Sequence, residues 1–141
     1  MENKSLEVVR IVSASIDRVW SAWTDPAEMK RWYAPESLTT PEVEVDLRVG
    51  GAYRIVMEGP DGQHIAKGKF TVIEELRELA FSWKWEGSPE SKTQVMITFE
   101  EVEPGKTKIV LRHDGFVDDK SQTMHTQGWE SSFNKLEKHL V

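Results

Sequence analysis

The middle of the chain is dominated by segments in which apolar and polar residues alternate, the pattern of strands with one buried and one exposed face. In 42–49 every second residue is a valine or leucine, and in 79–85 the alternate positions hold a leucine, a phenylalanine and two tryptophans. Short turns separate these segments, so neighbouring strands are expected to pair antiparallel as a meander. The predicted strands are 42–49, 52–58, 65–74, 79–85, 95–99 and 107–113, with turns at 50–51, 60–62 and 104–106.

The N-terminal part of the chain changes from a strand pattern to a helix pattern. The segment from Ser5 to Ser13 is apolar at both parities, as expected for a strand covered on more than one side. Large apolar residues at 16, 19, 20 and 23 then follow the spacing of one helical face, and Ser15 is suited to cap that helix. A strand followed by a short helix is therefore expected before the meander.

A second short helix is predicted to begin at Asp25. This residue is expected to act as the N-cap, with Pro26 in the first helical position and Glu28 reaching back to the cap. Pro35 closes the segment, since proline cannot continue the helix. The apolar face of this helix is expected to consist of Met29, Trp32 and Tyr33.

The C-terminal segment, 121–140, reads as one long helix. Its apolar stripe repeats with helical spacing at Trp129, Phe133, Leu136 and Leu140, and His125 lies one turn before it. A row of small residues at 128, 131 and 132 either lets the helix approach the sheet or leaves space beneath it. Because an antiparallel sheet must bury its apolar face, we expect an α+β fold in which six to seven strands curve around this helix.

Composition narrows the possible functions. The 141 residues fit one domain, 1–141, and carry a net charge of −6, which argues against binding to nucleic acid or to an anionic membrane surface. There is no cysteine, so no disulfide or thiolate chemistry is available. No signal peptide is visible, and no stretch approaches the roughly 18 apolar residues of a spanning helix. These features predict a cytoplasmic protein.

Several short motifs occur in an order that resembles the helix-grip domains of the START-like superfamily. More closely, the chain resembles the small bacterial members of the family named after the activator of the Hsp90 ATPase. One departure is Tyr33, where many relatives carry a second tryptophan. The motifs that carry the resemblance are Asp17-Arg18-Val19-Trp20, Trp23-Thr24-Asp25-Pro26, Arg31-Trp32-Tyr33-Ala34-Pro35, Gly50-Gly51, Pro60-Asp61-Gly62, Phe81-Ser82-Trp83, 105–107 and 125–129.

The resemblance implies a hydrophobic cavity between the sheet and the last helix, and no shared catalytic machinery. We therefore expect a small apolar or aromatic molecule as the ligand, with Trp32 and Tyr33 bordering the cavity entrance. For each aromatic residue the alternative is ordinary core packing, and a histidine on an apolar stripe is more often a hydrogen-bonded core residue. The candidate ligand-binding residues are Trp32, Tyr33, Tyr53, Ile55, Phe70, Trp83, Ile97, His113, His125, Trp129 and Phe133.

Other chemistries find less support in the sequence. The four histidines lack metal-ligand spacing, and no nucleophile elbow is present, so neither a metal, a cofactor nor a catalytic residue is expected. A cyclase-like or hydrolase-like enzyme remains the alternative, with His113 or His125 as general base and Tyr53 or Asp114 as its partner. A chaperone partner and the choice between monomer and homodimer also stay open.

Overall fold

The computed structural model describes residues 4–89 and 92–140, which form one seven-stranded antiparallel sheet and three helices. The strand order across the sheet is β1-β7-β6-β5-β4-β3-β2, so the predicted meander is confirmed and the first strand is added beside the last. In chain order the elements are β1 (Lys4–Val12), α1 (Ile16–Thr24), α2 (Pro26–Trp32), β2 (Thr39–Val45), β3 (Ala52–Gly59), β4 (Gly62–Glu74), β5 (Glu78–Trp85), β6 (Thr93–Glu103), β7 (Lys106–Phe116) and α3 (Asp119–Leu140).

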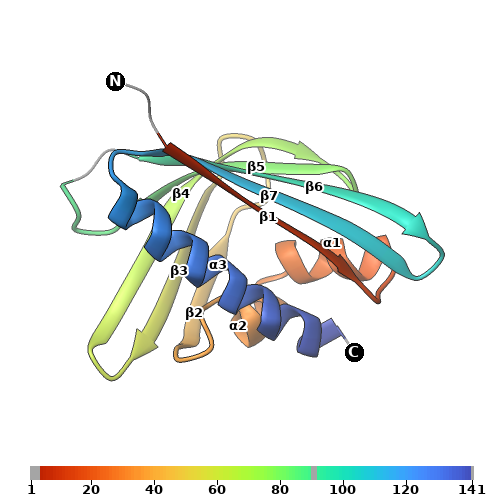
Figure 1. The fold of residues 1–141 in the computed structure, drawn as a ribbon, viewed down its shortest axis with the longest axis horizontal. Coiled ribbons are helices and arrows are strands. Elements are labelled where there is room, and N and C mark those ends of the chain that lie inside the picture. The colour runs from red at the N-terminus through yellow and green to blue at the C-terminus, as the bar shows by residue number, and fades with distance from the viewer. Residues whose placement is uncertain (1–3, 90–91, 141) are drawn as a thin grey trace.

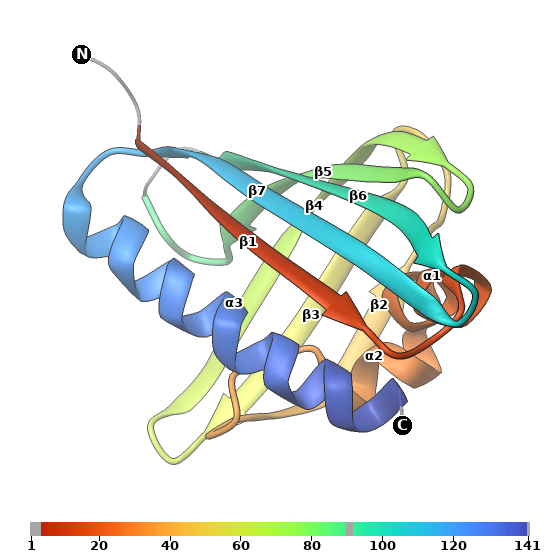
Figure 2. The same ribbon diagram turned by 45° about the vertical axis from the view of Figure 1, so that its right-hand side comes forward.

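The sheet is strongly curved, and α3 lies across its concave side (Figure 1). Strands β1, β7 and β6 form one side of the curve and β4, β3 and β2 the other, while α1 and α2 lie near the C-terminal end of α3 (Figure 2). The apolar stripe of α3 faces inward, because Trp129, Phe133, Leu136 and Leu140 are all buried. This is the helix-grip arrangement that the sequence predicts.

The centre of the core is a cluster of aromatic rings built around Trp23 of α1. Its ring centroid lies 4.6 Å from that of Trp32 and 5.7 Å from those of Tyr33 and Phe133. Trp32 is completely buried, and its indole N–H donates to the backbone oxygen of Ala22 at 2.8 Å. The rings of α1, α2 and α3 thereby hold the three helices together.

The caps of the two short helices agree with the sequence except at one residue. Ser15 accepts from the backbone N–H of Arg18, and Asp25 accepts from that of Ala27. The prediction that Glu28 reaches back to the cap is wrong. Its carboxylate instead contacts Arg18 of α1 and His139 of α3, because both groups lie over the first turn of α2. Burial would raise the pKa of Glu28, but hydrogen bonds led by that from His139 lower it overall.

The strand predicted at 42–49 ends earlier than its alternation suggests. Strand β2 stops at Val45, and the next residues turn back so that the Asp46 N–H bonds to the Ala52 oxygen at 3.0 Å. Leu47 and Val49, which the alternation placed on the buried face, are 43% and 64% exposed. The chain turns here with Gly50 at a positive φ of 84°, a conformation that glycine adopts without strain.

Gly68 in β4 lies beside an irregularity in the curved sheet, and such irregularities bend the strand that carries them. The register between β4 and β5 shifts just beyond this glycine, and two side-chain hydrogen bonds bridge the region. The Tyr53 hydroxyl donates across Gly68 to the Ser82 backbone oxygen at 2.6 Å, and the Lys69 N–H donates to Ser82 Oγ at 3.0 Å. A Cβ at position 68 would lie 1.9 Å from the Ser82 oxygen, so only glycine fits here.

Replacing this glycine tests its structural role. Gly68→Ala is expected to lower the free energy of unfolding by about 2 kcal/mol, because its methyl group collides with the backbone of β5. The matched control is Gly128→Ala in α3. Its new methyl would lie 3.8 Å from Pro35, an ordinary contact distance, and should leave stability unchanged or raise it by up to about 1 kcal/mol. Urea unfolding of both variants measures this. Equal effects of the two substitutions would contradict the explanation.

Candidate functional site

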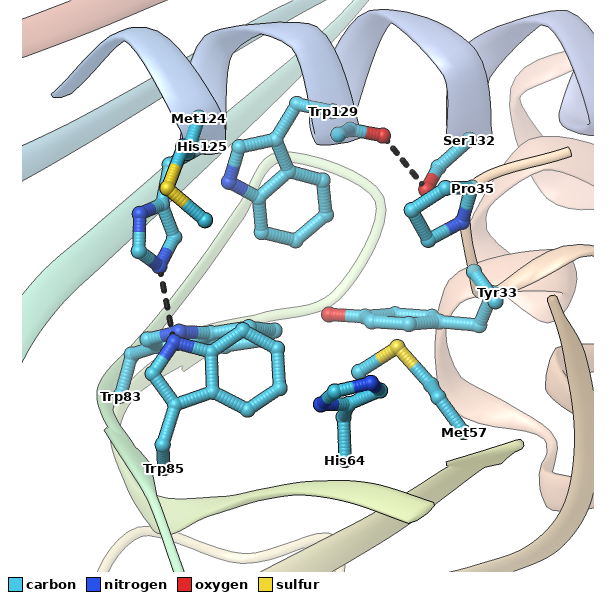
Figure 3. Close-up of a pocket in the computed structure, with 12 residues that line it drawn as sticks. Tyr33, Pro35, Met57, His64, Trp83, Trp85, Met124, His125, Trp129 and Ser132 are labelled. Atoms are coloured by element: carbon cyan, nitrogen blue, oxygen red, sulfur yellow. Dashed lines mark hydrogen bonds between the residues drawn. The ribbon is translucent and has the colours of Figure 1, made fainter. Parts of the chain in front are cut away.

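An apolar pocket of about 360 Å³ lies between the N-terminal half of α3 and the sheet (Figure 3). Three separate parts of the chain form its wall: the segment that follows α2, the ends of β3, β4 and β5 near the 59–62 turn, and α3 itself. Its volume lies within the usual range for small-molecule sites. The lining residues are Tyr33, Ala34, Pro35, Met57, His64, Trp83, Trp85, Met124, His125, Gly128, Trp129 and Ser132.

Three indole rings dominate the wall of this pocket. The centroid of Trp83 lies 5.3 Å from that of Trp129 and 5.4 Å from that of Trp85, so the rings are in direct contact. Trp83 and Trp129 are buried, whereas Trp85 is half-buried and lies at the rim. The pocket therefore presents large apolar ring surfaces and no lysine, arginine or carboxylate side chain among its described lining residues.

His113 supports this wall from behind without lining it. The indole N–H of Trp129 donates to His113 Nδ1 at 3.1 Å, which places the imidazole proton on Nε2, since an indole nitrogen only donates. The Nε2–H then donates to Thr93 Oγ1 at 2.6 Å. Burial, with the nearby His125 as the second cause, lowers the pKa of His113 to about 3. His113 is therefore a neutral core residue that fixes the orientation of Trp129.

His125 holds a second indole in the same way, and this pair does border the pocket (Figure 3). Trp85 donates its N–H to His125 Nε2 at 3.0 Å, while His125 Nδ1 lies 2.8 Å from the Ser121 backbone oxygen and donates to it. The His125 and His113 rings are 5.3 Å apart. Both histidines thus use their nitrogens to position tryptophans.

The structure brings four of the eleven candidate residues to the pocket: Tyr33, Trp83, His125 and Trp129. Trp32 lies in the aromatic core instead of at the entrance, because its ring packs beside Trp23. The others also lie away from the pocket lining, although all of them are buried on the inner side of the fold. These remaining residues are Tyr53, Ile55, Phe70, Ile97, His113 and Phe133.

The pocket also contains residues that the sequence did not single out as site residues. Gly128 and Ser132 belong to the row of small residues on α3, and that row was the available signal for space beneath the helix. Met57 has the inward parity of its strand, so it too could have been found. His64 and Met124 are exposed residues at the rim, and nothing in the sequence marks them. Ala34 and Pro35 lie just after α2.

The proposed partners of a catalytic histidine lie elsewhere. The Tyr53 hydroxyl is occupied by the Ser82 backbone oxygen, and burial raises the pKa of this phenol well above its ordinary value. Asp114 pairs with Arg112 at 2.9 Å. Among the described residues no group of three or more His, Asp or Glu side chains is placed to hold a metal ion. Within 4–89 and 92–140, none of the helices has the length and apolar character needed to cross a bilayer.

A curved antiparallel sheet wrapped around one long helix defines the class of helix-grip, START-like domains. Within this class the chain belongs to the family of Activator of Hsp90 ATPase homolog 1-like proteins, whose model matches residues 13–141. The resemblance noted from the sequence motifs is thereby confirmed. A comparison with curated protein sequences finds no match.

Solved structures of bacterial proteins share the fold over nearly the whole chain. A protein from Chromobacterium violaceum superposes with a TM-score of 0.88 at 22% identity, covering 96% of both chains. A Silicibacter pomeroyi protein described as AHSA1 gives a TM-score of 0.85 at 26% identity and covers 97% of both chains. CalU16 from Micromonospora echinospora gives 0.75 at 28% identity, covering 99% of this chain and 77% of its own.

The neutral state of His113 predicts a specific dependence of stability on pH. Its pKa is about 3 in the folded protein and close to the ordinary 6.5 in the unfolded chain, so unfolding takes up a proton between these values. The contribution of neutral His113 to the free energy of unfolding is therefore fully present above pH 6.5. It decreases as the pH falls toward 3, by up to about 1.4 kcal/mol per pH unit. His113→Asn keeps an acceptor oxygen for the Trp129 indole but cannot titrate.

Urea unfolding of the wild type and of His113→Asn at pH 7, 6, 5 and 4 measures this contribution. We expect the wild type to lose stability more steeply, so that the difference between the two proteins shifts in favour of the variant at low pH. Parallel curves for the two proteins would show that His113 does not titrate on unfolding and would refute the assignment.

Proposed function

We propose that this protein is a non-enzymatic binding domain that holds a small apolar or aromatic molecule between the sheet and α3. The observation that carries the proposal is the pocket wall formed by Trp83, Trp85 and Trp129. Indoles bury large apolar areas and offer flat faces to a ring system. Leaving such a wall facing water is unfavourable, and an apolar ligand would remove that surface from water.

The helix contributes space to this pocket. Gly128 lies on the wall, and outside the backbone of α3 a Cβ there would meet, among the described residues, just the Pro35 ring at 3.8 Å. Ser132, one turn further, donates its hydroxyl to the Gly128 backbone oxygen and so presents little polar character to the cavity. Small residues on α3 thus keep the helix from filling the pocket that the tryptophans border.

No observation favours the alternative of a histidine-dependent enzyme. A general base needs an unoccupied lone pair within reach of its substrate. The Nδ1 lone pair of His113 accepts from Trp129, and the Nε2 lone pair of His125 accepts from Trp85. A chaperone-related interaction is implied by the resemblance alone and stays a prediction. The oligomeric state, monomer or homodimer, stays open.

Filling the pocket from Gly128 tests the proposal. The neutral environment-sensitive dye 6-propionyl-2-dimethylaminonaphthalene is expected to bind the wild type and shift its emission to shorter wavelength. Gly128→Leu should weaken this binding at least tenfold, because the new side chain occupies the cavity, whereas Gly128→Ala should bind nearly as the wild type does.

Fluorescence titration gives the dissociation constants, and thermal unfolding of both variants shows that the fold is kept. Native mass spectrometry of protein taken directly from cells provides a second readout, in which a bound molecule should be present in the wild type and depleted in Gly128→Leu. The proposal fails if neither the dye nor a cellular molecule binds, or if the leucine variant binds the dye as tightly as the wild type.

A further inference from the structure

Tyr33 places a polar atom in the otherwise apolar pocket. The residue caps the C-terminal end of α2, and its side chain is 3% exposed. Its ring is held by Trp32, Trp23 and Trp129, whose centroids lie 4.8, 5.7 and 5.8 Å away. The hydroxyl points into the cavity (Figure 3) and forms no hydrogen bond with any described residue.

The other hydrogen-bond donors of the pocket wall differ from this hydroxyl. The indoles of Trp129 and Trp85 donate to His113 and His125, and Ser132 donates to the backbone of α3. Trp83 Nε1 has no partner among the described residues, but it is fully buried and out of reach of a ligand. His64 also lines the pocket and carries a ring N–H, but it is exposed and lies at the rim. Among the described lining residues the Tyr33 hydroxyl is therefore the deeply placed donor that a ligand can contact.

The surroundings of Tyr33 determine what kind of group can pair with it. Burial strongly raises the pKa of its phenol, so the group stays protonated and offers a hydrogen to an acceptor. Among the described residues the fully buried polar side-chain atoms without a partner are Trp23 Nε1 and Trp83 Nε1, so the Tyr33 hydroxyl is instead open to the cavity, where an acceptor on a ligand can reach it. A hydrogen bond shielded from bulk water is stronger than one made in water. No lysine or arginine is among the described lining residues, so an anionic acceptor would lose its hydration without gaining a counter-charge.

We propose that the ligand combines a flat apolar body with a neutral hydrogen-bond acceptor, a carbonyl or ether oxygen, that receives the Tyr33 hydroxyl. This inference rests on the proposed function and adds the chemical class of the molecule. The apolar body packs on Trp83 and Trp129, which flank the hydroxyl in the pocket (Figure 3). Tyr33 is thus the residue that selects and orients the ligand.

A matched pair of probes and one substitution test this assignment. 2-Acetylnaphthalene carries a carbonyl where 2-isopropenylnaphthalene carries a methylene group, so the two differ in the acceptor and hardly in shape. Tyr33→Phe removes only the hydroxyl. We expect the ratio of the dissociation constants, alkene over ketone, to be about tenfold higher in the wild type than in the variant, as measured by isothermal titration calorimetry.

Two further measurements make the result specific. 2-Naphthoate, an anion of similar size, should bind the wild type more weakly than the ketone does. The infrared carbonyl stretch of the bound ketone should lie at lower frequency in the wild type than in Tyr33→Phe, and this band reports the hydrogen bond directly. If the variant does not fold, a bound stretch in the wild type at the frequency seen in hexane already overturns the inference.

The outcomes separate this inference from the proposed function. Binding of both naphthalenes with the same ratio in wild type and Tyr33→Phe would overturn the role of Tyr33 and leave a general apolar pocket. Tighter binding of naphthoate than of the ketone would overturn the preference for a neutral acceptor. Failure of both neutral probes, and of the environment-sensitive dye, to bind the wild type would overturn the proposed function itself.

Discussion

The rest of the structure depends on the bend that lets one sheet enclose one helix. A seven-stranded sheet with an apolar inner face must bury that face, and α3 is the longest of the described helices, so the sheet curves toward it while α1 and α2 pack against β2, β6 and β7. Gly68 permits the close approach of β4 to β5, and Tyr53 bridges this region through the Ser82 oxygen. Since α3 carries the small residues Gly128 and Ser132 on its inner side near its middle, it leaves space beneath it, and the pocket lies there.

The pocket and the core share their walls. Trp129 packs toward Trp23 on one side, receives a neutral histidine as its hydrogen-bond acceptor, and borders the cavity with another part of its ring. Tyr33 likewise contacts Trp23 and ends in the cavity. The side chains that hold the helices together are thus the same ones that line the pocket. In this domain the pocket is one end of the core, not a feature added to the outside.

The sequence was a good guide to the elements and a poorer guide to the site, for physical reasons. A period of two identifies which face of a strand is buried, so Tyr53, Ile55, Phe70 and Ile97 were correctly placed inside. The period does not show which end of a strand lies opposite the small residues of α3. The side chains at that end are the ones that border the pocket. The sequence also does not reveal ion-pair partners that are distant along the chain. Glu28 fits a local capping pattern, but its carboxylate pairs with Arg18 and His139.

The packing of the buried aromatic rings that line the pocket would affect the entropy of binding a ligand. Tyr33, Trp83 and Trp129 are each held by neighbouring rings before any ligand arrives, so little side-chain entropy is lost when they are contacted. The freedom that remains is at the rim, where Met124 is 60% exposed and has a flexible side chain. A pocket with rigid buried rings and a flexible rim would select strictly for the chemical structure of the buried end of a ligand. It would tolerate variation at the exposed end of the ligand.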